Sequence, residues 1–91
     1  MPRYFFDTTD LIHAVDAEGA VLPDLDAARA MAFTAVGEML TDQARPGIPA
    51  RCQTTVRDEA GTRLLIITGH LSEEAAETAP FPPQVGSGST S

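Results

Sequence analysis

Apolar and polar residues recur along the chain with two different periods, and the longer period predicts a helix in the middle of the chain. Apolar residues recur at helical spacing from Leu25 to Leu40. Asp24 before them is a good N-cap, because its carboxylate can accept hydrogen bonds from free backbone amides. The stretch 45–49 holds two prolines and a glycine, which predicts that the helix ends near Gln43 or Ala44.

The predicted helix has one apolar stripe and one glycine in its interior. The stripe consists of Leu25, Ala28, Ala32, Val36, Met39 and Leu40. Gly37 costs about 1 kcal/mol relative to alanine at such a position. A close crossing of the helix against a sheet would explain this glycine.

Segments on both sides of the helix predict four β-strands. The aromatic-rich segment 3–8 and the shorter segment 11–15 form an antiparallel pair before the helix. After it, 51–57 alternates cleanly and indicates an edge strand. The segment 62–71 contains the run 64–67, which is apolar on both faces and indicates a central strand. The four residues 58–61 between them fit a type I turn.

These elements predict an α+β fold with the order ββαββ and the helix on one face of a four-stranded sheet. We expect the β-grasp-like strand order 2-1-4-3, with the first and fourth strands central and parallel. The alternative is an all-antiparallel order. The domain covers residues 1–71, and residues 72–91 are acidic, then rich in proline, glycine and serine, which predicts a disordered tail.

The turn before the last strand predicts which residues leave the core. If Gly61 takes a left-handed bulge position, Val56 pairs with Leu64. Leu65 and Ile67 then point to the face opposite the helix. A register shifted by one residue exchanges the pairs but still leaves two large aliphatic side chains outside.

Phe5 joins Leu65 and Ile67 on that outer face if its neighbours in the first strand point inward. An exposed apolar patch of this kind usually marks an interface. The sequence therefore predicts that a second copy or another protein covers the patch. The tail could also fold back over it through Phe81 or Val85.

Composition narrows the classes of partner. The 91-residue chain carries a formal net charge of −7, which disfavours binding to nucleic acid or to an anionic membrane surface. The chain has no apolar stretch that approaches the roughly 20 residues of a membrane span. One cysteine, Cys52, cannot form an internal disulfide, so we expect a cytoplasmic protein.

Candidate catalytic and ligand residues are few. His13 with Asp10 and Asp16 is a weak candidate for a metal site, although these acids also fit ordinary turn positions. Cys52 occupies an inward strand position, where cysteine mostly acts as a small apolar residue. No nucleophile–base pair or phosphate loop is evident, so we expect no enzymatic activity and no cofactor.

The motifs together resemble a family of small alphaproteobacterial domains of unknown function. The matching residues are Met1 to Phe6, Asp16, Glu18, Gly19, Leu22 to Leu25, Ala27 to Ala30, Asp58, Glu59, Gly61, Leu64 and Leu65. The resemblance covers about the first 70 residues of the 91 and implies no activity.

The sequence therefore favours a small cytosolic interaction or regulatory module. We expect it to form a homodimer, or to bind a protein partner, through the sheet face opposite the helix or through an edge strand. The alternative is a sensor that binds a small molecule or a metal through His13 and the acids of the first hairpin.

Overall fold

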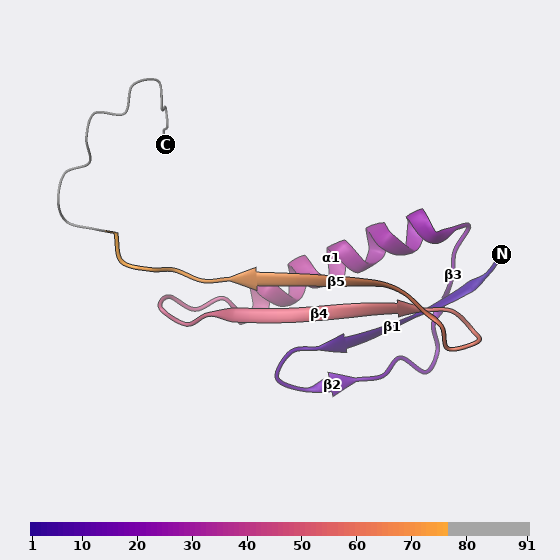
Figure 1. Ribbon diagram of the computed structural model, residues 1–91, viewed down its shortest axis with the longest axis horizontal. Coiled ribbons are helices and arrows are strands. Elements are labelled where there is room, and N and C mark those ends of the chain that lie inside the picture. The colour runs from indigo at the N-terminus through magenta and orange to yellow at the C-terminus, as the bar shows by residue number, and fades with distance from the viewer. Residues whose placement is uncertain (77–91) are drawn as a thin grey trace, which may run out of the picture.

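The computed structural model describes residues 1–76, which form an antiparallel sheet with one helix packed on it (Figure 1). The elements are β1 (Arg3–Thr9), β2 (His13–Ala14), β3 (Ala20–Val21), α1 (Leu25–Gln43), β4 (Ala50–Arg57) and β5 (Arg63–Leu71). The predicted α+β class is confirmed. Residues 72–76 carry no helix or strand, and the rest of the predicted tail, with Phe81 and Val85, lies outside the described residues.

The strand order is β2-β1-β4-β5, and every pair is antiparallel. The all-antiparallel alternative is therefore the observed one, and the β-grasp-like order with a parallel central pair is not. The path of the chain explains why. β3 pairs with the start of β1, so α1 runs along the sheet toward the end of β1, and β4 then returns beside β1 in the opposite direction.

This order reverses the predicted roles of the last two strands. β4 is central and β5 is the edge. The inward residues of β4 are all buried (Ala50, Cys52, Thr54 and Val56), whereas no residue of β5 is fully buried. The strand in which apolar and polar residues alternate, β4, is therefore the central strand with a covered inner face. The strand with the continuous apolar run, β5, is the edge strand.

Helix α1 begins and ends where the sequence predicts. The Asp24 carboxylate accepts a hydrogen bond of 2.9 Å from the amide of Ala27, which satisfies one of the free donors at the helix start. Ala28 and Ala32 are fully buried against the sheet. These small side chains bring the helix close to β4 and β5.

The close crossing is made by a glycine of the sheet and not by the glycine of the helix. Gly37 is exposed, and a Cβ built there would meet no atom within 4 Å. A Cβ on Gly69 would lie 2.5 Å from Cγ1 of Val36 and 2.7 Å from Cδ1 of Leu40. Gly69 in β5 is therefore the residue that admits the last turns of α1.

The β4–β5 hairpin begins in the predicted register and then shifts. Gly61 has φ of +88°, and the amide of Asp58 donates to the Thr62 carbonyl at 3.0 Å, as expected for this turn. A β-bulge then follows, because Arg57 pairs with Arg63 but Val56 pairs with Leu65. Every residue of β5 beyond the bulge is thereby moved by one position.

The first hairpin is smaller than the sequence predicts. Of the segment 11–15, only His13 and Ala14 pair with β1. Leu11 and Ile12 lie in the turn, and Leu11 is 96% exposed.

Candidate functional site

Asp16 links the loop before β3 to β1 where β1 has no strand beside it. Its Oδ2 accepts from the amide of Phe6 at 3.1 Å. Its Oδ1 accepts from the amides of Glu18 and Gly19, both at 3.0 Å. β3 pairs with β1 at Arg3 and Tyr4, and β2 pairs with β1 at Thr8 and Thr9. Between these two pairings, the Asp16 carboxylate accepts the hydrogen bond that a neighbouring strand would otherwise accept from Phe6.

Arg57 joins this loop to the centre of the sheet. Its Nε donates to Oδ2 of Asp7 at 2.8 Å, and an Nη donates to the carbonyl of Asp16 at 2.7 Å. Its guanidinium also stacks 4.6 Å from the ring centre of Phe5. The amide of Asp16 donates to the other oxygen of Asp7 at 2.9 Å, so the two carboxylates and the arginine form one connected network.

This network holds both acids in the ionised form. Burial alone would raise the pKa of Asp7, but hydrogen bonds from Arg57 and from the Asp16 amide, with the charge of Arg57, hold it below its ordinary value. Burial opposes the same shift at Asp16, where the amides of Gly19, Phe6 and Glu18 lower the pKa. Because these charge-assisted hydrogen bonds join β1, β4 and the loop before β3, the network stabilises the fold.

The sequence pattern did not predict this network, although the chain carries one signal for it. Asp7 and Arg57 have opposite charges and face the same side of strands that prove to be neighbours. The pairing depends on knowing that β4 adjoins β1, and the β-grasp-like order placed these strands apart.

The three candidate metal ligands, His13, Asp10 and Asp16, each form hydrogen bonds with different groups. Nδ1 of His13 lies 2.8 Å from Oγ1 of Thr9, whereas Asp10 accepts from the amide of Ile12 and from the side chain of Gln43. Asp16 is occupied by backbone amides. Within residues 1–76, no three His, Cys, Asp or Glu side chains form a group that could hold a metal ion.

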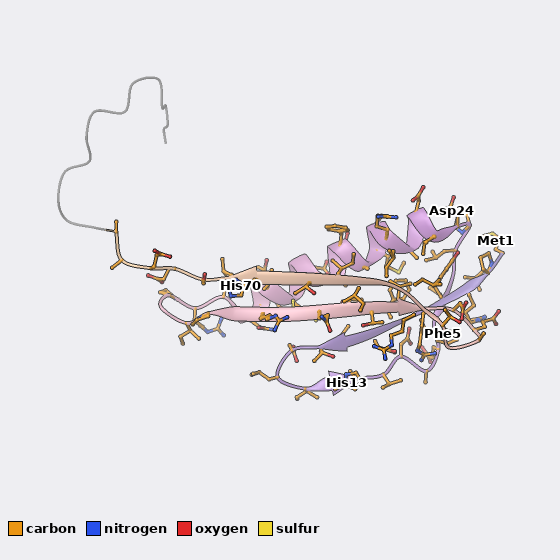
Figure 2. All side chains as sticks on the ribbon, in the orientation of Figure 1. Met1, Phe5, His13, Asp24 and His70 are labelled. Atoms are coloured by element: carbon orange, nitrogen blue, oxygen red, sulfur yellow. The ribbon has the colours of Figure 1, made fainter. Side chains whose placement is uncertain are left out.

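The two histidines and the cysteine are also far from forming a reactive set. His13 lies on β2 and His70 on β5, at opposite edges of the sheet (Figure 2). Cys52 is 1% exposed at an inward position of β4, and its Sγ lies 3.5 Å from the carbonyl oxygen of Val36. Burial, to which the negative charge of Asp10 adds, raises the pKa of the Cys52 thiol.

The predicted interface residues divide between the two faces. Phe5 lies on the outer face, opposite Arg57. Leu65 and Ile67 instead pack against the core on the helix side, so their predicted placement was wrong, because the bulge moves β5 by one residue. Ile66 takes the outward position and is 52% exposed.

The outer face is therefore more polar than predicted. Ile66 pairs with Thr55 of β4, and its neighbour Thr68 pairs with Gln53, whose side chain donates to the threonine hydroxyl at 3.2 Å. The apolar residues on this side are Ile66 of β5 and Phe5 of β1. The outer face of β4 and β1 offers mainly hydroxyl, amide and charged groups to a partner.

The free margin of β5 is the longest open strand edge in the described part of the chain. β5 has nine residues and pairs only with β4 within residues 1–76. The opposite edge is formed by β2, which has two residues. β5 therefore offers a row of backbone donors and acceptors that another strand could use.

Other exposed apolar side chains are scattered over the surface. Outside β5 they are Met1 before β1, Leu11, Ile12 and Val15 in the first hairpin and its loop, Val21 on β3, Met31 and Phe33 on α1, and Ile48 before β4. The sequence pattern does not predict that Leu11 and Ile12 are exposed in a turn, because apolar residues in the segment 11–15 indicate a strand. The signal was their position directly after Asp10, a turn former.

The comparisons with known proteins give a family but no activity. Residues 3–70 match the family model described as "Domain of unknown function (DUF6894)". Neither a curated protein nor a solved structure matches the chain. None of the helices formed by residues 1–76 has the length and apolar character needed to cross a membrane.

Proposed function

The chain belongs to the DUF6894 family of domains of unknown function, and on that premise we propose that it is a small interaction module that self-associates along the free edge of β5. The proposal keeps the expected dimer and the cytoplasmic setting. It moves the expected interface from the centre of the outer face to the margin of the sheet.

The unprotected edge of β5 carries this proposal. Proteins usually protect an edge strand by making it short, by placing charges or proline on it, or by covering it. The segment 64–69 contains neither a charged residue nor a proline, and no further strand pairs with β5 within residues 1–76. A long apolar edge of this kind is suited to pairing with another strand.

The burial of the flanking side chains supports the same surface. On the helix side, Val56 of β4 is fully buried, whereas its neighbours Leu65 and Ile67 on β5 remain half-buried. On the outer side, Ile66 is exposed. A strand added beside β5 would cover apolar area on both faces, at roughly 25 cal/mol for each Å² removed from water.

Self-association is favoured over an unrelated partner because the same edge is present on every copy. Most soluble oligomers are symmetric, and twofold dimers are the commonest. A twofold dimer needs only one self-complementary surface, and an antiparallel edge strand supplies one.

Light scattering over a concentration series of the full chain tests the proposal. We expect the mass to approach that of a dimer as concentration rises. Ile66→Lys places a charge on the edge and should leave the mass at that of the monomer. Phe33→Lys is the matched control, because it puts the same charge on an apolar residue of α1 that is 58% exposed.

Two results would overturn self-association through β5. One is a monomer at every concentration. The other is an equal loss of association in both variants, with circular dichroism showing that both are folded, because such a loss would trace to charge alone.

A further inference from the structure

We infer that the partner strand is β5 of a second copy, paired antiparallel about a twofold axis at Thr68. This inference rests on the proposed function and specifies its geometry. It follows from the direction of the free backbone groups and from the half-buried apolar residues of β5.

The bulge determines which backbone groups of β5 point outward. The carbonyl of Thr62 points toward β4, because it accepts from Asp58. Amide and carbonyl groups alternate in direction along an antiparallel strand, and the extra residue before Leu65 reverses the alternation. Ile66, Thr68 and His70 therefore direct their amides and carbonyls to the free edge.

An axis at Thr68 pairs these same groups with one another. Thr68 lies opposite Thr68 of the second copy, and Ile66 lies opposite His70 of the second copy. Each of these pairs presents donors and acceptors to the other strand, so the ladder of β4 and β5 continues across the axis into the second sheet.

The same arrangement covers the half-buried residues of β5. A twofold axis perpendicular to the sheet keeps both helices on one side. On that side Ile67 meets Gly69 of the second copy, and Leu65 meets Leu71 of the second copy. Leu71 is 44% exposed in the single chain, and this contact would remove part of that surface from water.

Cross-linking through a single engineered cysteine tests the register. In a full chain carrying Cys52→Ala, we expect Thr68→Cys to form a disulfide-linked dimer under mild oxidation, because the two residues face each other across the axis. Thr62→Cys in the same background is the control. Its two copies would lie roughly 40 Å apart at about 3.3 Å per residue and should not cross-link.

The results separate this inference from the proposed function. A dimer by light scattering in which Thr68→Cys does not cross-link, or in which Thr62→Cys cross-links equally, overturns the register and leaves self-association standing. A wild-type chain that stays monomeric overturns both.

Discussion

Gly37 and Gly69 are the same residue type with opposite roles, and their surroundings decide which role each has. Gly37 is in α1, faces solvent and has no atom near its missing Cβ. Gly69 is in β5 and has Val36 and Leu40 where its Cβ would be. The sequence shows both glycines but does not show what lies against them.

Replacing each glycine with alanine should therefore change stability in opposite directions. Gly37→Ala should raise the free energy of unfolding by about 0.5–1 kcal/mol, because alanine favours the helix. Gly69→Ala should lower it by about 1–3 kcal/mol through overpacking. Urea unfolding of the two variants measures both changes, and shifts of the same sign would contradict the assignment of the close contact to Gly69.

The hydrogen-bonded carboxylates of Asp7 and Asp16 make the stability of the fold depend on pH in the acidic range. Both groups have a folded pKa below the ordinary value of 3.8. Their contribution to stability is therefore complete above that value and is lost as the pH falls through the folded pKa.

Urea unfolding from about pH 5 downward should show this loss. Asp7→Asn should destabilise the chain at neutral pH and flatten its dependence on acid, because the variant has one fewer such carboxylate to protonate. Asp42→Asn, at an exposed position of α1, should retain the wild-type slope. An unchanged slope in Asp7→Asn would mean that this network does not govern the acid response.

At the scale of elements, the sequence predicted most where the signal is local. The start of α1 depends on Asp24 and the adjacent apolar stripe, and the structure confirms it. The turn at Gly61 is likewise correct, because a positive φ favours glycine. Each of these features depends on residues a few positions apart.

The strand order and the faces of β5 depend on features that the sequence pattern does not contain. Leu64, Leu65 and Ile67 are all large and aliphatic, so the pattern does not show which of them leaves the alternation. The bulge makes that choice through the pairing of Val56 with Leu65. One extra residue is sufficient to exchange the faces of everything after it.

The candidate site was predicted in outline only. Phe5 was correctly placed outside, and the idea of an edge or outer-face interface remains a prediction. Ile66 was missed because its face depends on the bulge, and the link between Asp7 and Arg57 was missed because it depends on strand order. The first error comes from a bulge inside the β4–β5 hairpin, and the second from the pairing of two strands that are far apart in the sequence.

For the molecule as a whole, a small domain with an open sheet edge should gain stability from association. If two copies pair through β5, the folded state is favoured by mass action, so the melting temperature should rise with protein concentration. The melting temperature can be measured by calorimetry or circular dichroism at about three protein concentrations that span roughly a hundredfold range.

Ile66→Lys should remove the concentration dependence and leave a single melting temperature. Phe33→Lys should keep the dependence of the wild type. A wild-type melting temperature that does not move with concentration would contradict an association coupled to folding.

The extra residue at Leu64 also has a consequence for aligning relatives of this chain. A relative without the bulge can keep the same buried faces only if its alignment carries a one-residue gap at Leu64. A relative of equal length without the bulge must place its inward aliphatic residues at the columns of Leu64, Ile66 and Thr68. An ungapped alignment would then match buried columns with exposed ones, so sequence variation across this hairpin becomes interpretable only after the pairing partner of Val56 is known.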